Sequence, residues 1–357
     1  MRKVCVYAIC KNEEKFVKRW YESMKEADKI IVLDTGSSDN TVNLLKECGV
    51  DVFVKKIDPW RFDVARNESL KLVPEDYEIC VCTDLDEVFL KGWKDKLLSS
   101  WKDDTTRARY LYNWSIKKDG SVGTSFYLNK IHRRDAYYWT HPVHEVLTSK
   151  VKENEILIPE IVLNHYPDVS KSRSNYLPLL ELSVKEDPKD DRNMHYLGRE
   201  YMYYGKYEDA IRTLKKHKRL KSATWKDERC ASDRFIARCY NALGNKKMAV
   251  KWYKKAILEA PYLRESYIEL AYLEYEREKY MEAYVLLKRA FEINNKSISY
   301  INEEFAWNYF PYDLMSICAF NLKLYNESYE NALKAFEKNK EDLRLKVNLE
   351  LIKKYIQ

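Results

Sequence analysis

Short apolar runs alternate with segments of helical spacing along the first part of the chain. The runs at 3–10, 29–34 and 78–84 predict β-strands, and DVFVKK at 51–56 predicts a further strand. Helical spacing continues to residue 24 after the first run and to residue 48 after the second, and it returns over 63–72. Strands that alternate with helices at this spacing predict a parallel sheet in a Rossmann-like α/β domain.

The pattern changes twice further along the chain. Residues 111–166 form short β-like pieces and hold four of the six histidines. Beyond Lys171 strand-like runs give way to successive amphipathic helices. Because 357 residues exceed the size at which one hydrophobic core stops growing, we expect two domains, an α/β domain over 1–170 and an all-α domain over 171–357.

Four segments of the second domain align as helix pairs. Ala210, Ala249 and Ala283 occupy the same place in their units and recur at intervals of 39 and 34 residues. A small residue there lets paired helices approach closely, and a period near 34 resembles the tetratricopeptide repeat. The aligned segments are 196–220, 234–261, 266–294 and 315–339.

Composition and charge argue against nucleic-acid-binding, membrane-spanning and cysteine–zinc proteins. The net charge of +7 is spread along the chain without a dense basic stripe, so nucleic acid is an unlikely partner. The first apolar run is too short for a signal sequence, and an apolar span of about 20 residues is lacking, so we expect a cytoplasmic protein without a transmembrane segment. The eight cysteines form no CxxC pair, and a cysteine zinc site is not indicated.

Polar clusters follow three of the predicted strands. Asn12-Glu13 follows the first strand, Asp34 ends the second, and Asp84-Leu85-Asp86 ends the fourth. Each cluster taken singly could instead be ordinary loop polarity, but ligands of parallel sheets sit at the carboxyl ends of the strands. Together the three clusters therefore predict a binding site.

Asp84 and Asp86 form the sharpest candidate. A D-x-D tripeptide occurs by chance roughly once in a chain of this size, so its position after a buried strand carries the argument. Two carboxylates there can hold Mg²⁺ or Mn²⁺, which in turn can clamp a diphosphate. A nucleoside diphosphate is the leaving group of glycosyl transfer from a nucleotide sugar, and its growing charge must be stabilised.

Six motifs in fixed order carry a resemblance to a known family. The pieces AICKNEEKFV, IIVLDTGSSDNTV, PWRFDVARNESL, CTDLDEVF, HPVHEVL and LNHYPD span the first 170 residues. In this order they resemble the family 2 glycosyltransferases of the GT-A fold. The subgroup includes lipopolysaccharide-core glucosyltransferases and, with helical repeats appended, bacteriocin peptide S-glycosyltransferases. Thr35 stands where many members carry a second acidic residue, which leaves the nucleobase open.

The resemblance implies roles for the residues that contact the donor. Asp34, with Asn12 and Glu13, would face the nucleoside of the nucleotide sugar. Arg66 would lie near the diphosphate, and Asp84 would contact either the ribose or the metal.

The resemblance also implies a metal site. Asp86 would be the direct ligand, and His165 would bring a further ligand to Mn²⁺ or Mg²⁺, since neutral imidazole suits such a mixed site. Without the motif, the alternative interpretation is that His165 is a histidine at the end of a strand with a satisfied hydrogen bond.

An inverting reaction needs a base that removes the acceptor's proton. Glu145 in HPVHE is the first candidate, because a carboxylate near a desolvated acceptor can have its pKa raised toward the working pH. His144 is a plausible substitute, Glu145 could instead orient His144, and Asp135 is a third candidate. The adjacent aromatic residues 137–139 could stack on a sugar ring or simply belong to the core.

We therefore expect an inverting glycosyltransferase that moves a sugar from a nucleoside-diphosphate sugar, UDP-hexose first, to a peptide or protein acceptor. The alternatives are transfer to a lipid-linked or cell-envelope glycan, and a repeat scaffold with an inactive transferase domain. A homodimer through the C-terminal repeats is a further expectation.

Overall fold

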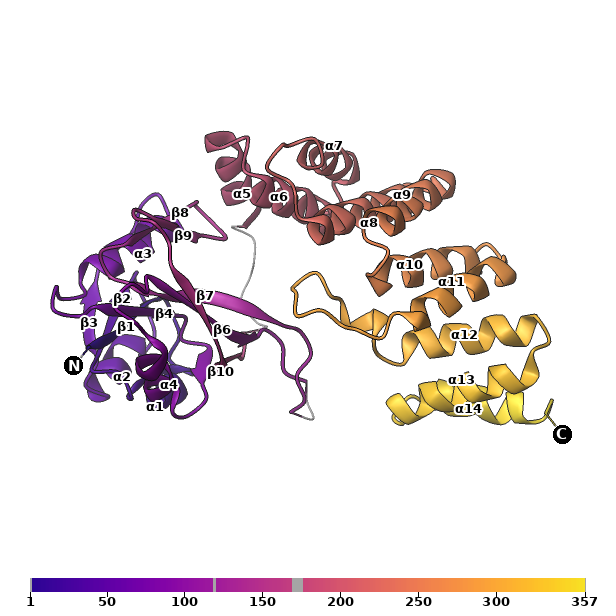
Figure 1. The fold of residues 1–357 in the computed structure, drawn as a ribbon, viewed down its shortest axis with the longest axis horizontal. Helices are drawn as coiled ribbons and strands as arrows, with labels where there is room; N and C mark the ends of the chain where they lie inside the picture. Colours follow the sequence, from indigo (N-terminus) through magenta and orange to yellow (C-terminus); the bar gives the residue numbers. More distant parts are fainter. Residues whose placement is uncertain (1, 118–119, 169–175, 357) are drawn as a thin grey trace. The chain divides into compact units, whose positions relative to one another are not determined.

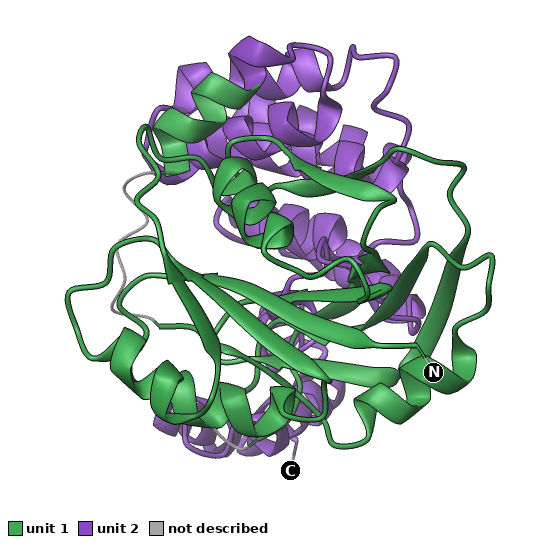
Figure 2. Ribbon diagram, turned by 90° about the vertical axis from the view of Figure 1, so that its left-hand side faces the viewer, with its two compact units in different colours: residues 1–183 green, residues 184–357 purple. Residues whose placement is uncertain are grey.

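The computed structural model describes residues 2–117, 120–168 and 176–356. The chain divides into two units, Met1–Ser183 and Val184–Gln357, which Figure 2 colours green and purple. The predicted domain boundary after residue 170 lies outside the described residues, and the division between the units falls within α5 (Tyr176–Glu186). Each unit is described by itself.

An eight-stranded mixed sheet forms the centre of the first unit (Figure 1). The strands of this unit are β1 (Val4–Cys10), β2 (Lys29–Asp34), β3 (Asp51–Val54), β4 (Ile79–Thr83), β5 (Glu87–Phe89), β6 (Arg107–Asn113), β7 (Ser125–Arg133), β8 (Tyr137–Thr140), β9 (Val146–Ser149) and β10 (Glu155–His165). Their order in the large sheet is β3-β2-β1-β4-β7-β6-β10-β5, and β8 pairs with β9 separately. The first four strands in this order are parallel, as the sequence predicts.

The second half of the sheet comes from β5 and from three strands formed after residue 100. β7 inserts antiparallel between β4 and β6, and β10 lies parallel to β6 and antiparallel to β5. The sequence predicts strands in this region but not that they extend the parallel sheet. β10 thereby brings its last residue, His165, opposite Glu87 of β5.

β1 is apolar throughout because both of its faces are covered. Val6 and its alternate neighbours pack in one core with Trp20 and Trp93, whereas Tyr7 packs on the other face with Leu70 and Trp139. The helices that supply these side chains or flank the strands are α1 (Val17–Met24), α2 (Thr41–Glu47), α3 (Phe62–Lys71) and α4 (Trp93–Ser100). Burial on both faces is the reason that this strand reads as a continuous apolar run.

Nine α-helices of the second unit's described part pack in sequence, each against the next (Figure 1). They are α6 (Asp191–Tyr203), α7 (Tyr207–His217), α8 (Lys226–Ala242), α9 (Lys246–Glu259), α10 (Arg264–Tyr275), α11 (Tyr280–Glu292), α12 (Phe310–Asn321), α13 (Tyr325–Lys338) and α14 (Leu343–Lys353). The predicted repeats match consecutive helix pairs, and Ala210, Ala249 and Ala283 are fully buried. The prediction of an α/β domain followed by a helical repeat domain is confirmed.

A segment between α11 and α12 interrupts the regular spacing of the repeats. It contains η1 (Glu304–Ala306) and places Glu303 beside Arg234 and Arg238 of α8. The Arg234 side chain is completely buried, and its Nε lies 3.3 Å from Glu269 Oε2. The insertion therefore supplies a carboxylate that a buried guanidinium requires.

The structure holds no helix, within its described ranges, that combines the length and apolar character needed to cross a membrane.

Gly198 of α6 lies in close contact with Leu214 of α7. A Cβ at this position would lie 2.5 Å from Leu214 Cγ and 3.3 Å from the Leu214 backbone nitrogen of α7. Alanine has the better helix propensity by about 1 kcal/mol, but a contact this short forces the helices apart.

We predict that Gly198→Ala lowers the free energy of unfolding by about 1–3 kcal/mol, because overpacking outweighs the gain in propensity. Urea denaturation followed by circular dichroism measures the change. The control is the same substitution in a Leu214→Ala background, where the clash is relieved and the cost should vanish. An equal cost in both backgrounds would rule out the steric cause.

Candidate functional site

The polar ends of β1, β2 and β4 lie at one edge of the sheet. Cys10 pairs with Asp34, and Ala8 pairs with Thr83, so the three strands reach this edge together. Asp84 follows Thr83 directly. The structure thus brings the three sequence-predicted clusters to a common edge, as parallel strands require.

The loop after β2 is organised by Asp34. Its buried carboxylate accepts hydrogen bonds of 2.9 Å from the backbone N–H groups of Gly36 and Ser37, and a further one from the Ser37 hydroxyl. Cys10 Sγ lies 3.4 Å from the same carboxylate. Asp34 therefore shapes this loop, and its contact with a nucleoside stays a prediction.

Asn12 and Glu13 hold the loop from the side of β1. The backbone N–H of Asn12 donates to Ser37 Oγ at 2.8 Å, and Asn12 Oδ1 accepts from the backbone N–H of Ser38 at 2.8 Å. Glu13 N–H donates to Thr41 Oγ1 at 2.8 Å. Asn12 adopts a positive φ of 56°, a conformation that asparagine tolerates better than most residues. These two residues and the loop form one continuous polar rim.

Arg66 joins two of the predicted site residues. Its side chain projects from α3 and is only 3% exposed. Its Nη2 donates to Asp84 Oδ1 at 2.7 Å, and its Nε donates to Glu145 Oε1 at 2.8 Å. Two carboxylates therefore neutralise one buried guanidinium, and they come from segments more than fifty residues apart in the chain.

Lys130 of β7 is a second cation at Asp84. Its Nζ lies 3.3 Å from Asp84 Oδ2. Burial by itself would raise the pKa of Asp84, but Arg66 and Lys130 outweigh that effect and hold the pKa well below its usual range. Burial lowers the pKa of Lys130, and the charges of Asp84 and Glu87 more than reverse this, so both groups are ionised at neutral pH.

Asp86 pairs with His165 across the edge of the sheet. Asp86 Oδ2 lies 3.3 Å from His165 Nε2, and His165 Nδ1 lies 2.9 Å from the Trp114 carbonyl oxygen. If Nδ1–H donates to that carbonyl, the lone pair of neutral His165 sits on Nε2, facing Asp86. Two ligands of an octahedral ion at about 2.1 Å lie about 3 Å apart, so these two atoms fit one Mn²⁺ or Mg²⁺ ion. Asp84, by contrast, already has two cationic partners.

The loop that carries the predicted base is fixed against α3. Phe62 N–H donates to the Pro142 carbonyl oxygen at 3.0 Å, which anchors the start of α3 to this loop. His141 and His144 have positive φ angles of 76° and 51°, in a region that only a few per cent of non-glycine residues adopt. The His144 ring packs against Tyr176 with the ring centres 5.8 Å apart, while Glu145 turns to Arg66.

Asp135, the third candidate base, lies at the opposite edge of the sheet. Arg133 pairs with Ile79 at the beginning of β4, and Asp135 continues beyond it and bonds to Arg133. The distance along β4 separates Asp135 from Asp84, so it does not share the site.

The aromatic residues near the loop divide between core and surface. Tyr137 and Trp139 are at most 2% exposed, and the Trp139 Nε1–H donates to the Tyr7 hydroxyl at 2.8 Å. These two rings belong to the core, as one of the two sequence hypotheses holds. Tyr138 remains 40% exposed.

Lys130 and Glu87 belong to the site but are not predicted from the sequence. Glu87 Oε2 accepts from the Asp84 backbone N–H at 2.9 Å, and burial raises the pKa of Glu87. A lysine between the apolar residues of the strand SFYLNKIHR is the one signal in the sequence that points to a charge in the sheet. Its partner is invisible in the sequence, because 46 residues separate it from Asp84.

Comparison with known proteins identifies the first unit's domain. Residues 5–146 match the family described as glycosyl transferase family 2. The glycosyltransferase SunS of Bacillus phage SPbeta and the prophage-derived SunS of Bacillus subtilis are each 27% identical to this chain over 222 residues, which cover 57% of this chain and 50% of each relative. An uncharacterized glycosyltransferase of Rickettsia typhi is 41% identical over 61 residues, 17% of this chain and 20% of that protein.

The chain spans about half the length of the SunS proteins that it matches. The first unit carries a family 2 glycosyltransferase domain, and the predicted resemblance is confirmed.

Solved helical-repeat structures resemble the chain only loosely. The crystal structure of MamA covers 50% of this chain and 99% of its own at 18% identity, with a TM-score of 0.39. A TPR protein of Thermus thermophilus covers 49% of this chain and 88% of its own at 18% identity, with a TM-score of 0.35. At these scores the likeness carries no argument, and the repeat architecture rests on the helix packing described above.

The Asp86–His165 pair predicts a raised histidine pKa in the metal-free protein. Burial lowers the pKa of His165, but the Asp86 carboxylate favours the imidazolium more strongly, and the net pKa is raised above 6.5. The pair therefore adds stability below the unfolded pKa, and this contribution is lost as pH rises through the folded pKa. Proton NMR of the imidazole, assigned with His165→Gln, should give a pKa above 6.5 that falls in Asp86→Asn. The same pKa in both proteins would contradict the pairing.

Proposed function

We propose that this chain is an inverting glycosyltransferase that moves a hexose from a nucleoside-diphosphate sugar, UDP-hexose first, to a peptide or protein acceptor. The observation that carries the proposal is the 3.3 Å contact between Asp86 and His165 at the carboxyl edge of the sheet. The buried Arg66 and the partly exposed Lys130 lie at the same edge, in a unit whose residues 5–146 match glycosyl transferase family 2. Donor, acceptor and stereochemistry are all part of the proposal.

The proposed donor site uses the charges at the sheet edge. Asp86 and His165 would hold Mn²⁺ or Mg²⁺, and Asp84 would join them or contact the ribose. When bound, the ion neutralises negative charge on the diphosphate. Arg66 and Lys130 are fixed positive charges beside the same edge, so they can stabilise the diphosphate as it leaves without reorganising. Asn12, Glu13 and Asp34 would shape the nucleoside end.

Glu145 is the proposed base that receives the acceptor's proton. Its carboxylate is 11% exposed and lies 2.8 Å from Arg66 Nε, so the base and the proposed diphosphate contact are mechanically linked. His144 is the alternative base, positioned in the same loop. A thiol acceptor is already partly ionised near neutral pH and would depend less on either residue.

The helical unit supports a polymeric acceptor. Stacked helix pairs form extended surfaces that bind chains and partner proteins. The resemblance to bacteriocin peptide S-glycosyltransferases points the same way. Transfer to a lipid-linked or cell-envelope glycan would use the same catalytic residues, and an acceptor screen separates the two classes.

We predict metal-dependent donor binding that requires Asp86. Calorimetry with UDP-, GDP- and TDP-sugars should show one donor binding in the presence of Mn²⁺, with at least about tenfold weaker binding for Asp86→Asn because a direct ligand is lost. Asp104→Asn, an exposed acid in a turn of the same unit, is the matched control and should bind as wild type. If folded wild-type protein binds none of the donors, the chain is a repeat scaffold with an inactive transferase domain.

We predict that Glu145→Gln slows turnover far more than it weakens donor binding. Because the acceptor is not known, turnover is measured as the slow transfer of the sugar to water. Loss of a general base should lower this kcat by about 10²–10⁴-fold. Nucleoside diphosphate release by Glu145→Gln and His144→Gln is compared with calorimetric donor affinity. A full rate in Glu145→Gln with loss in His144→Gln would assign the base to His144.

A further inference from the structure

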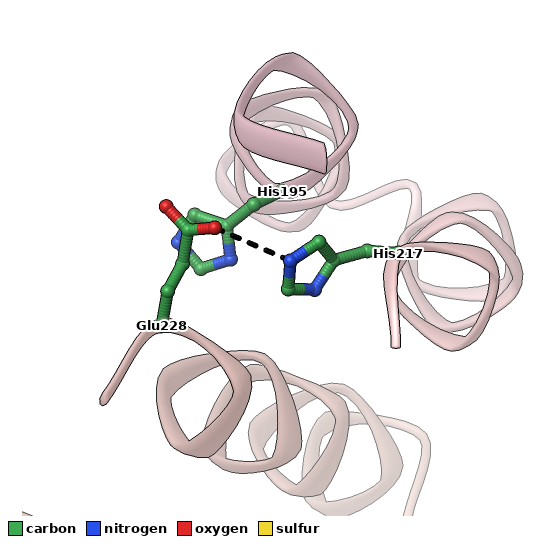
Figure 3. Close-up of side chains that lie close together, drawn as sticks. All are labelled: His195, His217 and Glu228. Carbon is green, nitrogen blue, oxygen red and sulfur yellow. Dashed lines mark ion pairs between the residues drawn. The ribbon is translucent and has the colours of Figure 1, made fainter. Parts of the chain in front are cut away.

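Three buried metal-ligating side chains converge in the helical unit, outside the site described above. His195 lies on α6, His217 ends α7, and Glu228 lies in the first turn of α8 (Figure 3). Each is at most 4% exposed, and one ligand atom from each lies within 4.8 Å of the other two. In residues 2–117, 120–168 and 176–356 this is the one set of three such groups placed so closely.

His217 presents a nitrogen with no hydrogen bond. Its Nδ1 lies 2.9 Å from Ser232 Oγ. Its Nε2 is buried and makes no hydrogen bond, although Glu228 Oε1 lies only 3.2 Å away. With Nδ1–H donated to the serine, the lone pair is on Nε2, in the form that a metal requires.

Outer partners orient all three side chains. Ser232 Oγ lies 2.8 Å from His195 Nδ1 as well as 2.9 Å from His217 Nδ1, so one serine holds both rings. The Tyr300 hydroxyl donates to Glu228 Oε2 at 2.5 Å, which leaves Oε1 to face His217. Such partners characterise metal sites, where they fix the rings and carboxylates that bind the ion.

The distance between His217 and Glu228 fits two ligands of a tetrahedral ion. Two ligand atoms about 2.0 Å from a tetrahedral metal lie about 3.3 Å apart, close to the 3.2 Å between His217 Nε2 and Glu228 Oε1. Two imidazoles and one carboxylate favour a borderline transition metal over Mg²⁺ or Mn²⁺. The alternative is a metal-free polar network in which His217 and Glu228 form an ion pair.

We propose that His195, His217 and Glu228 bind one zinc ion that joins α6, α7 and α8, with water as the fourth ligand. The ion would bind His217 Nε2, a buried nitrogen that makes no hydrogen bond in this structure. It lies in the other unit from the proposed donor site, and it does not depend on the transferase reaction.

The test measures zinc retained by the full chain. Tag-free Asp86→Asn protein, which lacks a ligand of the proposed donor site, is stripped with chelator, loaded with zinc and desalted. Elemental analysis should find about one zinc per chain, and the amount should fall below about a tenth in His217→Gln, since structural zinc depends on each ligand. His132→Gln, which changes an equally buried histidine of the first unit, is the matched control and should retain zinc.

If His217→Gln does not fold, a second variant and a spectroscopic metal probe test the same site. Glu228→Gln should lose zinc in the same assay, and cobalt(II) bound to the Asp86→Asn protein should give the strong visible absorption of a tetrahedral site, abolished by added zinc. Folded Asp86→Asn protein that retains no zinc, or equal zinc in the ligand variants, would overturn the proposal. Either result leaves Mn²⁺-dependent donor binding, which is measured separately, unaffected.

Discussion

The buried guanidinium of Arg66 ties together the candidate site of the first unit. A guanidinium stays charged at any pH a protein meets, so burying it at 3% exposure requires carboxylates at hydrogen-bond distance. Asp84 supplies one from the end of β4, and Glu145 supplies the other from the loop before β9. The positions of α3, the sheet edge and this loop are therefore fixed relative to one another by one side chain.

This arrangement gives the sheet edge both signs of charge in fixed places. Lys130 adds a second cation at Asp84, while Asp86 turns the other way toward His165. Asp84 and Asp86 are two residues apart but have different partners. Because the fold holds both cations in place, they would act on the diphosphate of the proposed donor without a cost of reorganisation.

The helical unit also buries an arginine that requires carboxylate partners. Arg234 is fully buried, and the insertion between α11 and α12 brings Glu303 to it. The same insertion brings Tyr300 to Glu228, beside His217. The irregular spacing that makes the repeats look degenerate in sequence is thus where the unit obtains partners for its buried polar groups.

The sequence by itself determines the elements whose signal is local. The central parallel strands β1, β2 and β4 are apolar because both of their faces are buried. The repeat helices follow from amphipathic spacing and small residues such as Ala249, and the acidic strand ends mark one edge of the sheet. Tertiary structure alone decides which charges meet, namely Lys130 with Asp84 and Glu145 with Arg66. It also decides that β7 pairs with β4. These pairings join residues far apart in the chain, and a buried charge selects its partner by distance in the fold, which no local pattern encodes.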